Sequence, residues 1–206
     1  SGFDYEESMA ASRQMASDNG WTLLTDSSWP GYTEIPRLVM EGYLIMGVEA
    51  AAQIEAIANP PTHVFLQAGV GGLAASIAAF SRQQWGDDPL IVVVEPDRAP
   101  CLTESIRVGR AVRTDGPVSN MGRLDTKEPS HVALMSLARD ADFYFNLSDE
   151  EAAETVDFLK GHGLATTPSG AAGVAALQHS GPWRMDLAID DSSRVLTFVS
   201  EGPEPT

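Results

Sequence analysis

Residues 62–73 read THVFLQAGVGGL, and this stretch decides the fold. Its first part is a short apolar and β-branched run, which predicts a buried strand over 62–67. Three glycines in four positions follow, and the apolar segment 73–82 predicts a helix directly after them. A second apolar run, 90–94, predicts another buried strand. Strand, helix and strand in this order form a βαβ unit, which implies a parallel sheet covered by helices on both faces.

The same alternation continues on both sides of this unit. Helical spacing of apolar residues predicts helices over 4–18, 36–58, 101–110, 130–139, 149–162 and 171–179. Strands are expected over 21–25, 141–147 and 194–199, with loops over 26–32 and 166–170. The predicted fold class is therefore α/β, with an open, mostly parallel twisted sheet and helices on both faces.

Composition narrows the class of protein. The 206 residues include 13 Lys and Arg against 29 Asp and Glu, a formal net charge of −16. Phosphate-rich partners select clustered basic side chains, so this balance argues against nucleic-acid and membrane-surface binding. A single cysteine, Cys101, excludes a disulfide framework, and no ligand spacing predicts a metal site. Because there is no long apolar run and the first segment is acidic, we expect a cytoplasmic protein.

The glycine loop predicts an anion site. Glycines let backbone N–H groups approach an oxyanion closely, and the N-terminus of the following helix adds positive potential. A phosphate group is the expected guest. Two alternatives stay open at this point. One is a tight turn with no ligand; the other is a dinucleotide site, with Gly69, Gly71 and Ala74 as a G-x-G-x-x-A pattern and Glu95 holding a ribose.

Three further segments offer polar side chains. One opens a helix, one lies in a turn, and one follows a strand, at the edge where open α/β sheets bind ligands. Residues 166–173, TTPSGAAG, open a helix with hydroxyl side chains and equally fit an ordinary N-cap. Ser200 follows the last predicted strand. Asp26 stands beside aromatic residues in the segment 26–32, where it fits a shielded general base or an Asx turn.

Together these segments resemble the diaminopropionate ammonia-lyase family, which consists of pyridoxal-phosphate enzymes of the tryptophan-synthase-β-like fold (fold type II). The resemblance covers the chain in order and rests on DSSWPGYTEIPRLVMEGY (26–43), PTHVFLQAGVGGLAA (61–75), IVVVEPDRAPCL (91–102), MGRLDTKEPS (121–130), TTPSGAAG (166–173) and VSEG (199–202). The glycine loop belongs to the whole fold type, whereas the first and fourth segments are specific to this group. The chain resembles the C-terminal half to two-thirds of such an enzyme.

The resemblance implies pyridoxal 5′-phosphate as cofactor and assigns residues of this chain to it. The phosphate is expected on the backbone amides of Gly69, Val70, Gly71 and Gly72. Ser200 is expected against the pyridine nitrogen, as an uncharged partner. Under this interpretation Glu95 is a strand-end residue near the cofactor rather than a ribose ligand.

The resemblance also implies a reaction. Asp26 is expected to remove the Cα proton of an amino-acid substrate, and Tyr32 and Ser169 are expected to line the substrate site. The reaction is α,β-elimination of ammonia from 2,3-diaminopropionate to give pyruvate and ammonia, a step of amino-acid catabolism. Arg123 stands where the family tends to carry a small residue, which would alter substrate choice. Two rivals remain: another fold type II dehydratase acting on serine, threonine or hydroxyaspartate, and a non-catalytic module that binds an anion or a partner chain.

One departure from the family concerns lysine. The family's Schiff-base lysine is expected upstream of Ser1, and the two lysines here, Lys127 and Lys160, stand in other contexts. We therefore interpret the chain as a fragment, with residues 1–30 ending a smaller domain and residues 31–206 forming the C-terminal part of the large cofactor-binding domain. Its implied partners are the missing N-terminal segment and a second copy in a homodimer. Alone, it is expected to show no lyase turnover.

Overall fold

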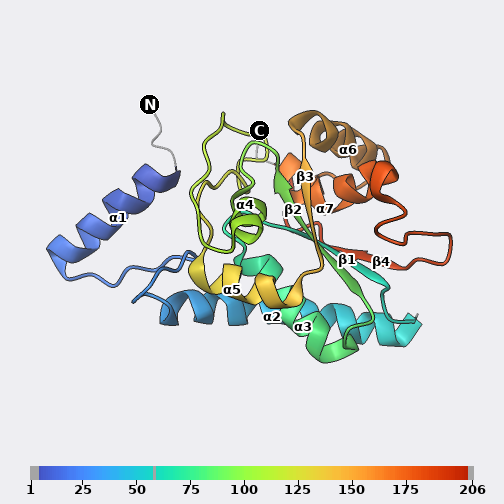
Figure 1. The fold of residues 1–206 in the computed structure, drawn as a ribbon, viewed down its shortest axis with the longest axis horizontal. Coiled ribbons are helices and arrows are strands. Elements are labelled where there is room, and N and C mark those ends of the chain that lie inside the picture. Colours follow the sequence, from blue (N-terminus) through green and yellow to red (C-terminus); the bar gives the residue numbers. More distant parts are fainter. Residues whose placement is uncertain (1–4, 58, 204–206) are drawn as a thin grey trace.

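The computed structural model describes residues 5–57 and 59–203, which form a parallel sheet flanked by helices (Figure 1). The strands are β1 (His63–Gln67), β2 (Leu90–Pro96), β3 (Phe143–Leu147) and β4 (Val195–Thr197), in the spatial order β3-β2-β1-β4. β1 is central, because Phe65 pairs with Val92 of β2 and with Thr197 of β4. All pairings are parallel, so the strands end at the same edge of the sheet.

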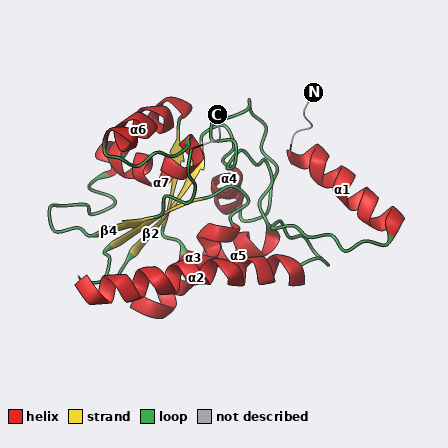
Figure 2. Cartoon of the chain, turned by 180° about the vertical axis from the view of Figure 1, so that it is seen from behind, coloured by secondary structure: helices red, strands yellow, loops and turns green. Residues whose placement is uncertain are grey.

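Helices cover both faces of the sheet, which confirms the predicted fold class. They are α1 (Tyr5–Asn19), α2 (Glu34–Ile57), α3 (Gly72–Trp85), α4 (Cys101–Val108), α5 (His131–Asp140), α6 (Asp149–Gly161) and α7 (Pro168–His179). Figures 1 and 2 show α2, α3 and α5 on one face and α6 and α7 on the other, with α1 beside the rest of the molecule. A short 3-10 turn, Gly181–Trp183, follows α7. Within the described residues, no helix has both the length and the apolar character needed to span a bilayer.

Buried side chains form two apolar layers, one on each side of the sheet. Along β1, Val64 and Leu66 belong to the layer that includes α3 and α5, whereas Phe65 belongs to the layer that includes α7. This alternation follows from the two-residue period of a strand. Because both faces of the sheet are buried, its central strands read as continuous apolar runs.

One predicted strand is wrong. Residues 21–25 form no strand, although their pattern is apolar and β-branched. In the described chain they have no neighbouring strand, and the side chains of Trp21 and Leu24 are 61% and 75% exposed. The segment is held instead by the Tyr32 hydroxyl, which donates to the Leu23 carbonyl at 2.5 Å. An apolar run without a pairing partner does not become a strand.

The predicted start of α7 is also wrong. The sequence predicts a loop over 166–170 and a helix from 171, but the helix begins at Pro168. Thr167 is its N-cap and accepts a hydrogen bond from the Gly170 amide at 3.2 Å, and proline is favourable in the first turn because no N–H partner is needed there. The other predicted elements are present with boundaries shifted by a few residues. The predicted helix ends at residues 4 and 58 lie outside the described residues.

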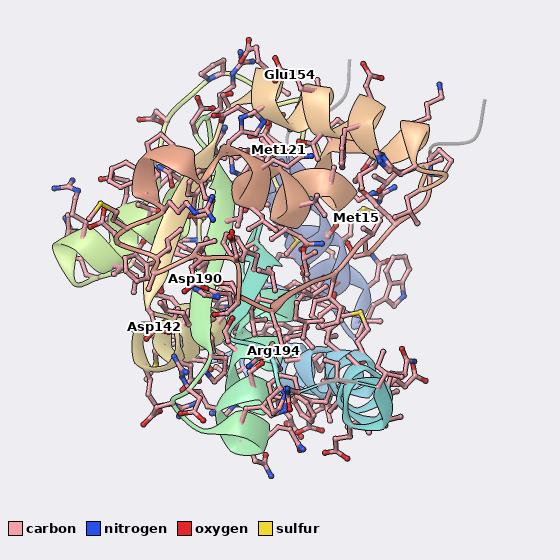
Figure 3. All side chains as sticks on the ribbon, turned by 90° about the vertical axis from the view of Figure 1, so that its right-hand side faces the viewer. Met15, Met121, Asp142, Glu154, Asp190 and Arg194 are labelled. Carbon is pink, nitrogen blue, oxygen red and sulfur yellow. The ribbon has the colours of Figure 1, made fainter. Side chains whose placement is uncertain are left out.

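Polar contacts tie the strands together at their amino ends. Asp142, which precedes β3, accepts hydrogen bonds from Arg82 Nη2 at 2.6 Å and from the Ile91 amide at 2.8 Å. Arg194, which precedes β4, donates from its amide to Thr62 Oγ1 at 2.9 Å. Figure 3 labels Asp142 and Arg194, and both lie in the lower half of that view. These contacts lie at the amino ends of the strands, whereas the cleft described below lies at their carboxyl ends.

Gly173 sets how closely α7 packs on the sheet. A Cβ added there would overlap Thr197 Oγ1 and lie 3.3 Å from the Phe65 carbonyl oxygen. Gly173→Ala is therefore expected to lower the free energy of unfolding by about 1–3 kcal/mol, because packed interiors tolerate added volume poorly. Urea unfolding followed by circular dichroism measures the change.

Gly161→Ala is the matched control. A Cβ at this position of α6 meets nothing within 4 Å, and alanine is the better helix former. This variant is expected to match the parent in stability or to exceed it slightly. Equal destabilisation by the two substitutions would contradict the packing argument.

Candidate active site

A cleft of about 590 Å³ opens at the carboxyl ends of β1 and β4, the edge where open α/β sheets bind ligands. Its lining comes from segments far apart in the sequence: the turn after residue 25, α2, the loop after β1, residues 122–126 and the residues after β4. Among the lining residues are Asp26, Gly69, Val70, Gly71, Gly72 and Ser200. The structure therefore brings together most of the predicted site residues.

The glycine loop directs its carbonyls into the protein. The carbonyls of residues 69–71 accept, in that order, from Cys101 Sγ at 3.9 Å, the Ser130 amide at 2.9 Å and the Ala75 amide at 2.9 Å. Across the described parts of the chain, no acceptor contacts the amides of these three loop residues. Residues 69–71 lead directly into α3, whose N-terminus carries partial positive charge. Amides without a protein acceptor at a helix N-terminus suit an anion such as phosphate.

Two loop positions leave little room for a side chain. A Cβ on Gly69 would lie 3.0 Å from the Arg123 carbonyl oxygen, and a Cβ on Gly71 would lie 3.1 Å from the Leu102 side chain. Gly71 also has a φ of +100°, in the left-handed region that favours glycine. The loop is therefore packed between two other parts of the chain, which fixes its shape.

Asp26 is held at the cleft because the turn after it is bonded to the start of α5. The buried hydroxyls of Ser28 and Ser130 are 2.7 Å apart. Ser28 Oγ accepts from the Val132 amide at 2.8 Å, and the Ser28 carbonyl accepts from the His131 amide at 2.9 Å. Ser130 is the N-cap residue of α5 but makes no capping bond with its side chain. Ser28 therefore caps this helix from a distant part of the sequence.

Sequence reasoning missed several residues of the cleft lining. Tyr43 fits the apolar face of α2, yet it lines the cleft, 3.9 Å from where a Cβ on Gly72 would lie. Burial and the negative charge of Asp26 raise the pKa of Tyr43, so its hydroxyl stays protonated. Thr126 and Gln67 also line the cleft. The one sequence signal for the position of Tyr43 is a tyrosine among the aliphatic residues on the apolar face of the helix.

Ser169 lines a second cavity, of about 620 Å³, instead of the first. Arg123 and Glu201 line both cavities and form an ion pair. Ser169 Oγ accepts from the Arg123 amide at 3.1 Å, and the Thr167 hydroxyl donates to the Glu201 carboxylate. The predicted substrate contact Ser169 therefore supports the wall that the two cavities share.

Tyr32, the other predicted substrate residue, lies outside the cleft lining. Its ring stacks on Trp29 with 4.3 Å between centroids, and the Arg13 guanidinium lies 3.6 Å from the centroid of Trp29. These contacts connect α1 to the turn that carries Asp26. Tyr32 shapes that turn from outside the cleft.

Glu95 is also outside the cleft lining. Its side chain is 1% exposed, and its carboxylate accepts from the Leu102 amide at 2.8 Å and the Thr103 amide at 2.7 Å. Burial raises the pKa of Glu95 to about 7, against the opposing effect of these donors. Glu95 anchors the start of α4, so the dinucleotide alternative loses its ribose ligand.

Neither lysine is part of the cleft lining. Lys127 Nζ lies 2.6 Å from Asp125 Oδ1 and donates to the Arg98 carbonyl at 2.8 Å, and its side chain is only 13% exposed. Lys160 is exposed on α6. The described ranges contain no group of three or more His, Cys, Asp or Glu side chains placed to hold a metal ion.

Comparison with known proteins identifies the family to which this chain belongs. The sequence model described as "Pyridoxal-phosphate dependent enzyme" matches residues 1–201. The chain belongs to this family. Diaminopropionate ammonia-lyase from Escherichia coli (strain K12) is 31% identical over 213 residues, which cover 97% of this chain and 53% of that protein. A probable D-serine dehydratase from Chromobacterium violaceum is 28% identical over 152 residues, which cover 68% of this chain and 34% of that protein.

A solved structure shares the fold. The crystal structure of diaminopropionate ammonia-lyase from Escherichia coli, in complex with an aminoacrylate-PLP azomethine reaction intermediate, matches with a TM-score of 0.91 at 28% identity. The match covers 98% of this chain and 55% of that chain. The predicted resemblance and the fold type II architecture are confirmed. The chain spans about half the length of the curated relatives that it matches.

The residues of the cleft fit pyridoxal phosphate, the cofactor of this family. The loop amides without protein acceptors and the N-terminus of α3 suit its phosphate. Ser200 supplies an uncharged hydroxyl to the same cleft, and Asp26 supplies a carboxylate. The cleft therefore brings together backbone N–H groups without a protein acceptor, a hydroxyl group and a carboxylate.

Ser28→Ala is expected to lower the free energy of unfolding by about 1–3 kcal/mol, because the Val132 amide and the buried Ser130 hydroxyl lose their partner. Ser27→Ala is the matched control, since Ser27 donates a hydrogen bond to Thr25 Oγ1 through its backbone amide, which the substitution keeps. Urea unfolding measures both variants. If Ser28→Ala were no less stable than Ser27→Ala, the capping role of Ser28 would be wrong.

Glu95→Gln tests the raised pKa of Glu95. Because the folded state holds this proton up to about pH 7, wild-type stability falls as pH rises from about pH 5 to about pH 8. The variant lacks the titrating group, so the stability of the wild type relative to the variant is expected to fall by about 2–3 kcal/mol over that range. Urea unfolding at both pH values measures it. A difference that stays constant with pH would show that Glu95 titrates normally.

Proposed function

We propose that this chain forms the phosphate- and ring-binding part of a lyase that uses pyridoxal phosphate to eliminate ammonia from 2,3-diaminopropionate, giving pyruvate and ammonia. The observation that carries the proposal is the single cleft that joins the glycine loop, Ser200 and Asp26. The similarity to diaminopropionate ammonia-lyase over 97% of this chain supports the choice of substrate.

Each part of the cleft has a role in this reaction. The bound cofactor supplies an electron sink for the electron pair left at Cα. The amides of residues 69–72 bind the phosphate and so fix the cofactor in the cleft. Ser200 would hydrogen-bond to the ring nitrogen, and Asp26 would accept the Cα proton. Tyr43, which stays protonated beside Asp26, closes one side of the cleft.

We further propose that a longer protein completes this site. The support is that the chain spans about half of its curated relatives and that neither Lys127 nor Lys160 lines the cleft. The Schiff-base lysine then lies upstream of Ser1, residues 1–30 end a smaller domain, and residues 31–206 belong to the large one. The whole protein is a cytoplasmic homodimer, and the chain alone has no lyase turnover.

A second candidate is the elimination of water from D-serine. It is favoured by the probable D-serine dehydratase that matches 68% of this chain. The cleft residues serve either reaction, because the same Cα proton is removed and only the leaving group differs. Product stoichiometry separates the two: diaminopropionate yields two ammonia molecules for each pyruvate, and serine yields one.

Asp26→Asn, in the protein made from its complete gene, is expected to lower kcat with 2,3-diaminopropionate by about 10²–10⁴-fold, the usual contribution of a positioned general base. Cofactor absorbance is expected to stay unchanged. Asp87→Asn, at an exposed position outside the cleft, is the matched control and is expected to retain full activity. Pyruvate and ammonia release measure both variants.

Two results would overturn the proposal. Activity of Asp26→Asn equal to that of Asp87→Asn would remove Asp26 from catalysis. A higher kcat/KM with D-serine than with 2,3-diaminopropionate, at one ammonia for each pyruvate, would favour the dehydratase.

A further inference from the structure

A long loop forms one wall of the cleft. Between α4 and α5 the described chain has neither helix nor strand over residues 109–130, drawn in yellow-green beside α4 in Figure 1. Irregular loops of this length are uncommon within a compact domain and are often functional. Residues 122–124 line the cleft, and the backbone of Arg123 and Leu124 lies against Gly69. The position of this loop therefore decides the shape of the cleft beside the glycine loop.

The ammonium group of Lys127 holds this loop together from inside. Its Nζ donates to the Arg98 carbonyl at 2.8 Å and to the Pro117 carbonyl at 3.2 Å, and it lies 2.6 Å from Asp125 Oδ1. These three oxygens equal in number the three N–H donors of an ammonium group. They belong to the segment after β2, to the middle of the loop and to its last part. One cation therefore joins three parts of the chain.

Protein encloses this cation on several sides. The side chains of Lys127 and Asp125 are 13% and 11% exposed, and Asp125 Oδ2 accepts from the Ser119 amide at 3.3 Å. The Arg98 carbonyl is also covered by Gly116, where an added Cβ would overlap the carbonyl oxygen. Removal of the cation would leave the Asp125 carboxylate buried without this partner, which costs more than the loss of an exposed ion pair.

The loop also closes at Lys127. The Thr114 amide donates to the Lys127 carbonyl at 2.9 Å, so residues 114 and 127 are held side by side. The residues that lie against the glycine loop, 122–126, come between these two positions. The shape of the cleft wall therefore depends on the group that occupies the space between the three oxygens.

We propose that the Lys127 ammonium acts as a tethered cation, and that Lys127 is a positioning residue that holds the cleft wall at 122–126 against the glycine loop. This inference rests on the proposed function, in which the glycine loop binds the cofactor phosphate. The three oxygens recognise a monovalent cation with N–H donors, and the covalent tether is dispensable. A free alkylammonium ion therefore replaces the side chain once that side chain has been removed.

Lys127→Ala, in the protein made from its complete gene, removes the atoms that n-propylammonium can supply. The variant is expected to lower the thermal unfolding midpoint by about 5 °C or more, because the Asp125 carboxylate stays buried without its partner. It is expected to bind pyridoxine phosphate, which has the phosphate of the cofactor but no aldehyde, about tenfold less tightly. n-Propylammonium chloride is expected to restore both quantities. Tetramethylammonium chloride, which has the charge but no N–H donor, is expected to restore neither.

Two further variants separate the charge from packing. Lys127→Met keeps an unbranched side chain without charge and fills the space, so it is expected to lose probe affinity with no recovery in n-propylammonium. Lys127→Arg keeps the charge and is expected to lie closer to the wild type than Lys127→Met does. Lys160→Ala, at an exposed position on α6, is the matched control and is expected to behave as the wild type in either salt. Circular dichroism checks that each variant folds.

The outcomes separate this inference from the proposed function. Wild-type midpoint and probe affinity in Lys127→Met would overturn the inference. So would a Lys127→Ala variant that n-propylammonium does not restore, or that both salts restore equally. If Lys127→Ala does not fold, an arginine variant no more stable than the methionine variant would overturn it. Absence of probe binding by the wild type would contradict the proposed function, whereas the unfolding midpoints still test the tethered cation.

Discussion

The packing of the glycine loop between two other parts of the chain is the constraint on which the site depends. The backbone at residue 123 lies against Gly69, and the Leu102 side chain lies against Gly71. Because protein fills the space on those sides, the loop carbonyls bond inward and its amides remain for the cleft. The arrangement of these acceptor-free amides is thus a product of core packing, and a side chain at either glycine would disturb both.

Much of the fold could be predicted because its information is local. The runs at 62–67 and 90–94 are apolar without interruption since both faces of the sheet are buried, and the glycine loop marks the turn between strand and helix. The segment 21–25 shows the limit of such patterns. It has strand-like side chains, but a strand also needs a neighbour, and pairing is decided by parts of the chain far away in sequence.

Two kinds of information predicted residues of the cleft: the family resemblance, which assigned Asp26, and position at the end of a strand. Parallel strands end at the same edge of a sheet. Gly69 follows β1 and Ser200 follows its neighbour β4, so the two residues must lie near each other. Glu95 also ends a strand, but the amides of α4 take up its carboxylate, and no local pattern predicts that contact. Tyr43 is the converse case. Its helical spacing predicts a core residue, whereas the packing of α2 on α3 exposes it to the cleft.

The bond between Ser28 and the first turn of α5 has a consequence for motion. The two residues it joins, Ser28 and Val132, are 104 positions apart, so the turn that carries Asp26 cannot leave the cleft without uncapping the helix. Loop opening and fraying of α5 are therefore one cooperative event. Hydrogen exchange at the Val132 amide reports that event directly. Any ligand that orders the Asp26 turn slows this exchange, although Val132 itself lies outside the cleft lining.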